Sequence, residues 1–465
     1  MGSTNLSEYN AFFMPSTIPS STLSSNPLTD RDMSQYRWFI VALLFIATTI
    51  NYLDRQVISL LKPILAEEFS WTESDYAGIV MAFTAAYGLS TLLVGYIIDK
   101  IGTKLGYVGS ILVWSLAAMV HALAGSTAGF MVARALLGIG EAGNFPASIK
   151  TVAEWFPKKE RALAVGIFNS GANVGAVIAP AVVPAIALAA GWQAAFIATG
   201  ALGFVWIVAW WLMYDVPTRH PRVSPAELAH IAEEPAMIGD ASATDLGADT
   251  PTLGRYNIFG NRAIWGFMAG KLLTDPIWWF FLFWLPAYLS DVYHLDLKKL
   301  GAPLIIIYLA ATVGSVGGGL LSSKLIQKGW HPTRARQYAM LLFAVCVVPV
   351  TAISQVNSMG VVIAILSLAV AAHQAWSANI FTVAADQFPK QVLSRVVGLG
   401  TMAGTLGGVV FPLLVGRLLD HYKQLGQLSE GYYQLFYIAG AAYLIAWALL
   451  YLFVFRHAKQ TNIPG

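Results

Sequence analysis

The chain has 465 residues, of which 57% are hydrophobic and only 11% are charged. Soluble domains usually carry about 25% charged residues, so this composition excludes an ordinary soluble protein and indicates a membrane protein with many spans. The net charge of +3 comes without basic runs, which argues against a nucleic-acid-binding protein.

Residues 1–36 are rich in serine, threonine, proline and asparagine, and we expect a flexible cytoplasmic tail. They lack the basic start, apolar centre and small-residue cleavage site of a signal peptide. The first membrane helix is therefore expected to direct insertion itself.

Apolar windows of about 19 residues recur along the rest of the chain and predict twelve transmembrane helices. The fourth and fifth windows are the weakest, because Glu141 and a run of glycine and proline dilute them. We expect an all-α membrane protein in which two six-helix bundles enclose a central cavity. The predicted spans are residues 38–61, 77–98, 105–124, 127–149, 163–187, 193–214, 264–290, 301–326, 337–355, 359–384, 394–418 and 432–455.

One long polar segment, residues 215–262, separates the first six spans from the last six. Its stretch Ser-Pro-Ala-Glu at 224–227 predicts a capped surface helix, with proline at the first helical position. Every other loop is short. We therefore expect one bundle over 37–214 and a second over 263–456, related by an axis along the membrane normal, with a tail at 457–465.

Lysine and arginine in short loops set the orientation of a membrane protein, because such loops stay in the cytoplasm. The first loop on the other side is acidic and that side has few basic residues. Both termini are therefore expected in the cytoplasm, with the protein in the plasma (inner) membrane. The basic residues of the cytoplasmic side are Lys100, Lys104, Lys158, Lys159, Arg161, Arg219, Arg222, Arg255, Arg262, Lys324, Lys328, Arg334, Arg336, Lys390, Arg395, Arg456 and Lys459.

Two charged residues, Asp54 and Arg55, stand side by side inside the first span. A charge at the centre of a bilayer costs about 2.5–3.5 kcal/mol even on the lenient insertion scale. Such residues line a protein interior or a watery cavity, and the pair indicates that the middle of this protein handles ions.

After the second span, residues 95–104 read Gly-Tyr-Ile-Ile-Asp-Lys-Ile-Gly-Thr-Lys, and this order resembles the cytoplasmic loop signature of the major facilitator superfamily. We expect its glycine to let two helices approach closely, and its aspartate to cap a helix or pair with a base, closing the cytoplasmic side in one state. The second half repeats the signature weakly, with Ser323 in place of the aspartate. The resemblance implies a cytoplasmic gate formed by Gly95, Asp99, Lys100, Gly102 and Lys104.

The run Asn-Tyr-Leu-Asp-Arg at 51–55 and the pair Arg134 and Glu141 resemble the anion:cation symporter branch of that superfamily. The resemblance implies that Asp54 and Glu141 are protonation sites and that Arg55 or Arg134 meets the anion. Arginine can hold a carboxylate with two charge-assisted hydrogen bonds. The alternative is a static set of buried ion pairs that fixes helix packing.

Three further segments together resemble the hexuronate transporter subgroup. They are Lys-Leu-Leu-Thr-Asp-Pro at 271–276, followed by several tryptophans, His-Gln-Ala-Trp-Ser at 373–377, and Asp-Gln-Phe-Pro at 386–389. Lys271 and Asp275 are four residues apart and can pair on one helical face. Trp278, Trp279 and Trp284 can form a flat apolar wall against a sugar ring, or can pack or lie at the membrane interface. Amide and imidazole groups can bind sugar hydroxyls or can hold helices together. These polar candidates are His373, Gln374 and Asn379.

Other residues are cavity candidates because they are polar or aromatic within the spans. In the fifth span, Asn169 and Asn173 can bind hydroxyls, but Ala172 stands where aldonate-type relatives carry glutamine, which argues against an aldonate. In the eleventh span, the glycines around Thr401 predict helix packing first and a binding hydroxyl second. The aromatic candidates of the first two spans are Tyr52 and Tyr87.

The function that we expect is proton-coupled symport of a hexuronate, such as galacturonate or glucuronate, by alternating access. The alternatives are another organic anion (an aldonate such as galactonate, or an aromatic acid), sodium coupling, and a sugar-acid sensor. No phosphate-binding loop or catalytic triad is present in the sequence, so neither ATP nor enzyme activity is expected. The single cysteine, Cys346, argues against a disulfide or cysteine-based metal site. We expect no cofactor, metal or nucleic acid, a membrane-lipid environment, and a monomer.

Overall fold

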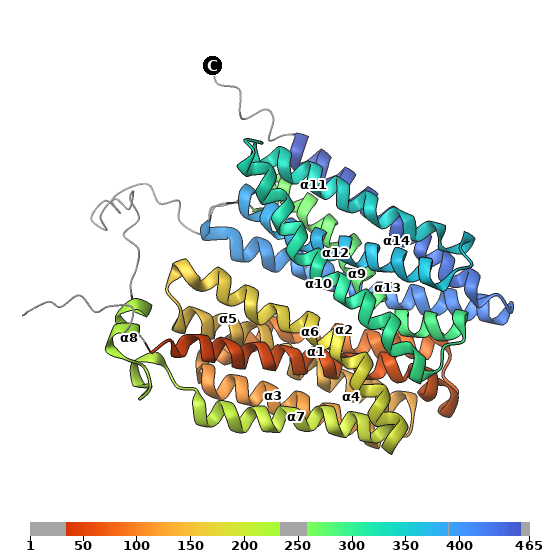
Figure 1. Ribbon diagram of the computed structural model, residues 1–465, viewed down its shortest axis with the longest axis horizontal. Coiled ribbons are helices and arrows are strands. Elements are labelled where there is room, and N and C mark those ends of the chain that lie inside the picture. Colours follow the sequence, from red (N-terminus) through yellow and green to blue (C-terminus); the bar gives the residue numbers. More distant parts are fainter. Residues whose placement is uncertain (1–33, 233–257, 389, 457–465) are drawn as a thin grey trace, which may run out of the picture.

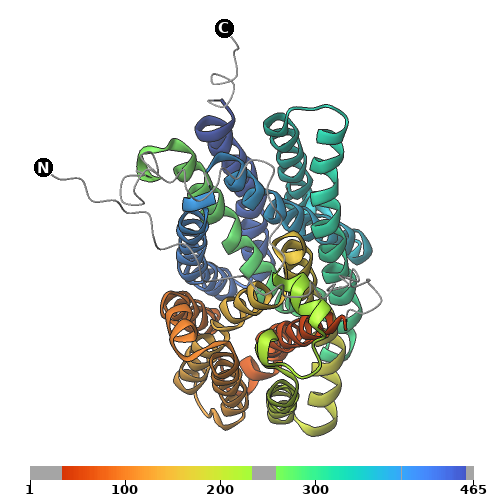
Figure 2. The ribbon, with the colours of Figure 1, turned by 90° about the vertical axis from the view of Figure 1, so that its left-hand side faces the viewer.

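The computed structural model describes residues 34–232, 258–388 and 390–456, and within these ranges the chain is helical without strands. The predictions for the N-terminal tail, most of the linker and the C-terminal tail therefore fall mainly on residues 1–33, 233–257 and 457–465, outside the described part. The helices form two groups, one from each half of the chain, which lie against each other (Figures 1 and 2).

The first bundle contains the helices that precede the linker. They are α1 (Tyr36–Glu68), α2 (Glu73–Ile101), α3 (Thr103–Val120), α4 (Thr127–Glu141), α5 (Asn144–Trp155), α6 (Lys158–Ala190) and α7 (Trp192–Met213). The second bundle contains α9 (Arg262–Tyr293), α10 (Leu297–Gln327), α11 (Pro332–Val347) with the short helix Val348–Gln355, α12 (Met359–Gln387), α13 (Lys390–Gln424) and α14 (Leu428–Leu450) with its extension Tyr451–Phe455.

Ten helices of the described part are long and apolar enough to cross a membrane, or eleven if α2, which bends by 49° after Thr91, is one span. The all-helical membrane fold is confirmed. The number of helices that are long and apolar enough to span the membrane is ten or eleven in the described part, below the predicted twelve. The fourth predicted span, 127–149, is two helices, α4 and α5, separated by Ala142 and Gly143. Outward-facing apolar side chains such as Val205, Leu212 and Val313 are exposed, as expected for surfaces that face lipid.

Small residues determine which helices touch within each bundle. A Cβ atom at Gly171 or Gly175 of α6 would clash with backbone oxygens of α1, and one at Gly314 or Gly318 of α10 would clash with the α12 backbone. Both pairs are four residues apart, the spacing that brings two membrane helices into close contact. The close approach to α1 brings the polar residues of that helix to the centre of the first bundle.

A short helix of the linker, α8 (Pro225–Ala232), lies beside the start of α1 (Figure 1). We call this end of the molecule the linker face and the other end the opposite face. Glu227 accepts hydrogen bonds from the backbone NH groups of Tyr36 and Arg37, at 2.9 and 3.0 Å, and from the Ser34 hydroxyl. Its carboxylate also pairs with the Arg37 guanidinium at 3.1 Å. A linker residue thus caps α1, which ties α8 to the first bundle.

We expect the substitution Glu227→Gln to lower the thermal unfolding midpoint at neutral pH. Burial raises the pKa of Glu227, but the hydrogen bonds from Ser34 and the start of α1 outweigh it and hold that pKa below its ordinary value. The stabilisation, about 2 kcal/mol for charge-assisted bonds, is therefore present at neutral pH and is lost as the pH falls through the lowered pKa. Melting curves of purified wild type and variant should differ at pH 7 and converge in acid. Equal midpoints at pH 7 would contradict this role.

Candidate functional site

The centre of the first bundle holds an ion pair between two predicted residues. Arg55 of α1 donates from Nε and Nη2 to one oxygen of Glu141, at 2.9 and 2.6 Å. Nη2 also donates to the Asn51 amide oxygen at 3.3 Å. The side chains of Arg55 and Glu141 are only 3% and 0% exposed. The second Glu141 oxygen has no hydrogen-bond partner among the described residues, so one acceptor beside the pair is unused.

Four aromatic rings surround the Arg55 guanidinium and confine it to one position. Its central carbon lies 4.6–5.5 Å from their centres, within the range of cation–π attraction. The rings of Tyr52 and Tyr87 were predicted as cavity residues, and that of Phe83 was not. Trp279, which belongs to α9 of the second bundle, was expected to form an apolar wall against a sugar ring. The four rings are those of Tyr52, Phe83, Tyr87 and Trp279.

Arg134 of α4 is the second predicted cation, and it is fully buried. Its Nη2 donates to the Arg55 backbone oxygen at 3.2 Å, and its guanidinium carbon lies 4.9 Å from the Phe83 ring centre. Its Nε and Nη1 have no hydrogen-bond partner in the described part of the chain. Arg134 therefore supports the backbone beneath Arg55 and keeps two unused donors in the core.

Asp54 lies on a different side of α1 from Arg55, because neighbouring helical residues point about 100° apart. It is 2% exposed, and neither carboxylate oxygen makes a hydrogen bond within the described ranges, although Thr199 of α7 lies beside it. A buried carboxylate without a partner is costly when ionised. Its surroundings therefore suit a group that takes up a proton.

The second bundle contributes a separate ion pair. Lys271 of α9 contacts Asp275 at 2.7 Å, on the predicted four-residue spacing, and its Nζ lies 4.4 Å from the Phe381 ring centre. The lysine side chain is 7% exposed, against 20% for that of the aspartate. The aspartate is therefore the more accessible member of the pair.

Two other predicted residues meet beside this pair. The Trp278 indole stacks on the His373 imidazole with ring centres 5.1 Å apart and planes 2° apart, and His373 Nδ1 is hydrogen-bonded to the Tyr443 hydroxyl. Tyr443 was not predicted, since nothing in its apolar span sets it apart from a packing residue. Trp278, His373 and Tyr443 thus link α9, α12 and α14 through polar and aromatic contacts.

The remaining binding candidates are distributed over the facing helices. Asn379 donates to Gly318 O of α10 and to Ala375 O, both at 2.9 Å, which is the interhelical bond considered as its alternative role. Gln374 and Asn173 are partly buried. Asn169 and Thr401 are exposed.

Two charged residues of the predicted gate motif pair with the first bundle and with the start of the linker. Asp99 pairs with Lys150 of α5 at 2.8 Å, and Lys104 with Asp215 at 3.6 Å. Gly102, with φ of 88°, forms the turn between α2 and α3 that suits glycine. Lys100 is exposed.

The close helix approach expected at Gly95 is not made in this conformation, because a Cβ atom there would meet nothing within 4 Å. Contact between α2 and α13 lies nearer the opposite face. There Thr84 donates to Gly408 O at 3.0 Å, and Gly88 packs against Thr405.

At the opposite face, charged groups connect the two bundles. The buried Lys62 donates to both oxygens of Glu73, at 2.8 and 2.7 Å, and lies 3.9 Å from Asp291 of α9. Asp420 of α13 accepts the backbone NH groups of Glu73 and Ser74 at 2.7 and 2.8 Å. A carboxylate of the second bundle therefore caps a helix of the first, a favourable position at the positive end of the helix dipole. Sequence reasoning missed this contact because its partners are 346 or more positions apart.

We expect Asp420→Ala to loosen this closure. The two capped amides lose their acceptor, worth about 1–2 kcal/mol, so exchange of the amide hydrogens in residues 73–80 should accelerate about tenfold. Residues 283–291 of α9 should accelerate as well, because Tyr76 donates across the interface to Phe283 O at 2.8 Å. Hydrogen–deuterium exchange measures both regions. Lys423→Gln is the control, since its contact with Glu73 is 3.9 Å long. Unchanged exchange in α9 would show that the cap is only local.

Two helical bundles that meet around buried, incompletely paired charges define a helical membrane transporter. A family model described as the Major Facilitator Superfamily matches residues 44–412. The chain belongs to this superfamily, and the predicted class, a multi-pass transporter and not an enzyme, is confirmed.

Sequence relatives bear out the predicted resemblance to the hexuronate subgroup. The chain is 34% identical over 394 residues to the hexuronate transporter of Escherichia coli K12. This alignment covers 84% of the present chain and 89% of the relative. It is 33% identical over 285 residues to the galacturonate transporter of Dickeya chrysanthemi. That alignment covers 61% of the present chain and 81% of the relative. The D-galactonate transporter of Escherichia coli O6:H1 is 28% identical over 400 residues, in an alignment that covers 85% of the present chain and 92% of the relative.

A solved structure shows the same fold. A bacterial homologue of the human lysosomal transporter Spinster, in an inward-facing and occupied conformation, superposes with a TM-score of 0.74 at 18% identity. The alignment covers 92% of this chain and 99% of that structure.

Proposed function

We propose that this protein is a symporter that couples proton movement to uptake of a hexuronate, such as galacturonate or glucuronate, by alternating access. The observation that carries the proposal is the buried Arg55–Glu141 pair inside its aromatic cage. An arginine fork suits a sugar carboxylate, and the chain is similar to transporters named for hexuronate and galacturonate.

Coupling follows from the charges around Arg55. While Glu141 is ionised, it neutralises Arg55 and blocks the guanidinium. A proton on Glu141 removes that negative charge, and the substrate carboxylate then takes its place on Arg55. If the proton binds without the substrate, or the substrate without the proton, a charge stays unpaired in a buried site, which costs about 3–5 kcal/mol. Both bind or neither binds, and these are the two states in which the bundles can close.

Asp54 acts as a second proton site in this proposal. Its carboxylate is buried without a hydrogen bond, so its negative charge opposes any closed state that excludes water. Protonation of Asp54 removes that cost. Arg134, with two unused donors, stabilises the first bundle during the exchange of partners on Arg55.

The second bundle is proposed to recognise the sugar ring. Trp278 offers an apolar face, while Lys271, Asp275 and His373 offer groups that bind hydroxyls. Supporting hydroxyl contacts come from Gln374, Asn169, Asn173 and Thr401, and Asn379 holds α12 against α10. Each bundle then carries part of the substrate, so that binding favours their closure around it.

We also propose that both termini lie in the cytoplasm and that the protein sits in the plasma membrane. Basic residues concentrated at the linker face support this orientation. With the linker face inside, the closed opposite face corresponds to an inward-facing state. The motif at Asp99, Lys100 and Lys104 would then act when the cytoplasmic side closes.

Uptake of labelled galacturonate into proteoliposomes tests the function. An inward proton gradient without sodium should drive accumulation above equilibrium, by about tenfold per pH unit at 1:1 coupling. Unlabelled glucuronate should compete, and galactonate or an aromatic acid should compete poorly. Stronger competition by galactonate would reassign the substrate to the aldonates, and accumulation driven only by sodium would overturn the proton assignment.

A further inference from the structure

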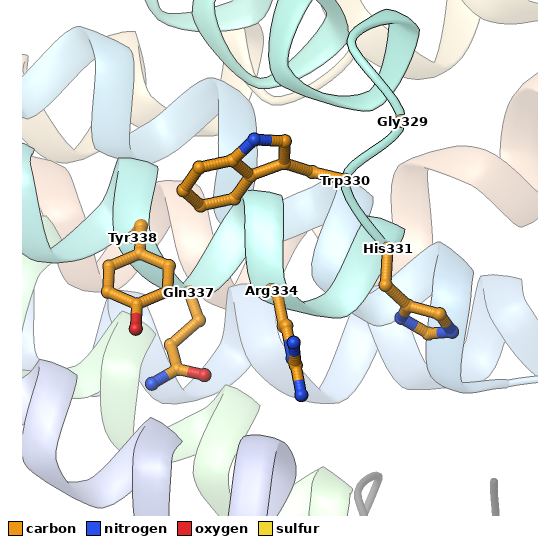
Figure 3. Close-up of a pocket in the computed structure, with 6 residues that line it drawn as sticks. All are labelled: Gly329, Trp330, His331, Arg334, Gln337 and Tyr338. Atoms are coloured by element: carbon orange, nitrogen blue, oxygen red, sulfur yellow. The ribbon is translucent and has the colours of Figure 1, made fainter.

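A polar pocket at the linker face lies outside the transport site. It occupies about 540 Å³ where α10 turns into α11, and it is lined by Gly329, Trp330, His331, Arg334, Gln337 and Tyr338. Figure 3 shows the Arg334 guanidinium and the Gln337 amide directed the same way, with the Trp330 and Tyr338 rings on one side and the His331 imidazole on the other. No lining residue is acidic. The pocket therefore suits an anion.

Two of its polar groups are unused. Arg334 makes no hydrogen bond or ion pair in the described ranges, whereas its neighbour Arg336 pairs with Asp386 and donates to Thr382. Residue Gln337 is 9% exposed and lines the pocket, and its amide makes no hydrogen bond with any described residue. Only its backbone oxygen accepts a hydrogen bond, from the Trp447 indole. The Gln337 amide is therefore accessible from the pocket and available to a ligand there.

The local charge strengthens the case for an anionic ligand. From Leu297 to Ala385 the sequence contains no aspartate or glutamate, while Lys324 and Lys328 precede the pocket. Basic pockets between transmembrane helices at the cytoplasmic side of a membrane bind anionic lipid headgroups.

The pocket also borders the surface that faces lipid. Trp330 and Tyr338 are 42% and 51% exposed and form an edge-to-face pair with centres 5.6 Å apart. Leu342 and Val345 continue the exposed apolar face of α11 away from the linker face. Aromatic residues mark the level of lipid headgroups, and the apolar face below them follows the direction of an acyl chain.

We propose that this pocket binds one phospholipid with an anionic headgroup. The headgroup phosphate accepts hydrogen bonds from Arg334 and from the Gln337 amide, and the acyl chains lie along Tyr338, Leu342 and Val345. Bound in this way, the lipid joins the turn between α10 and α11 to the bilayer surface.

Native mass spectrometry of the full-length protein in detergent, titrated with phosphatidylglycerol, tests the proposal. Wild type should bind one phosphatidylglycerol more tightly than phosphatidylcholine, and Arg334→Gln should weaken that binding about tenfold, the loss expected for one charge-assisted contact. Gln337→Leu, which keeps the volume and removes the amide, should weaken it as well. Lys299→Gln removes an exposed charge at the opposite face and should bind as wild type does.

Three results would overturn the proposal. The first is equal phosphatidylglycerol binding by wild type, Arg334→Gln and Gln337→Leu. The second is equal binding of phosphatidylcholine, which would remove the recognition of charge. The third is displacement of the lipid by millimolar inorganic phosphate or glycerol 3-phosphate, which would assign the pocket to a soluble anion.

Discussion

Replacement of Glu141 by glutamine is expected to abolish accumulation of galacturonate driven by a proton gradient. Glutamine keeps the size of the side chain but cannot exchange a proton, and it leaves Arg55 without its anionic partner. A gradient of one pH unit stores about 1.4 kcal/mol, so the wild type should reach about tenfold accumulation at 1:1 coupling. The variant should not accumulate substrate, because its empty form leaves Arg55 unpaired and cannot close to return, whether or not Asp54 carries a proton. Binding should persist, because the substrate carboxylate can still occupy Arg55.

Proteoliposome uptake and counterflow separate these two steps. Counterflow exchange of labelled for unlabelled substrate needs binding and closure but no net proton movement, so the variant should retain it. Glu430→Gln, which removes an exposed carboxylate at the opposite face, serves as the matched control and should accumulate substrate normally. Full accumulation by the Glu141 variant would show that the proton is carried elsewhere, with Asp54 the next residue to test.

Replacement of Arg55 by lysine is expected to weaken substrate binding about a hundredfold. Lysine keeps the positive charge but loses the planar fork that holds a carboxylate through two parallel bonds. The lost bidentate contact is worth about 3 kcal/mol, which corresponds to that factor. Lysine also fits the ring cage poorly, since the rings of Tyr52 and Trp279 contact the flat guanidinium.

Isothermal titration of purified protein with galacturonate measures the affinity. Lys299→Gln is again the control for general electrostatics, because it changes an exposed charge far from the site. Arg134→Lys should alter binding less, since Arg134 donates to the backbone oxygen of Arg55 and the proposed substrate contact is made by the Arg55 side chain. A larger loss of galacturonate affinity for Arg134→Lys than for Arg55→Lys would show that Arg134, and not Arg55, holds the substrate carboxylate.

Much of the first bundle's site was predictable because its signal is local. A charge inside an apolar span has few physical explanations, and this singled out Asp54 and Arg55 without knowledge of the fold. Arg134 and Glu141 were singled out by the resemblance to the anion:cation symporter branch. The four-residue spacing of Lys271 and Asp275 likewise predicted a pair that the structure contains. Aromatic residues were harder to assign, since tryptophan in a membrane helix usually packs or faces the interface. Trp279 completes the cage around Arg55, yet in the sequence it is one ring among many.

The sequence by itself determined the membrane class, the division into two halves and the identity of the buried charges, because composition and intramembrane charge depend on each residue alone. Only the tertiary structure decided which charges pair. Arg55 meets Glu141 and not the adjacent Asp54, because the rotation of α1 against α4 sets the partner, and apolar periodicity leaves that rotation open. The Asp420 cap on α2 likewise exists only because one end of each bundle touches the other, a contact between segments far apart in the chain.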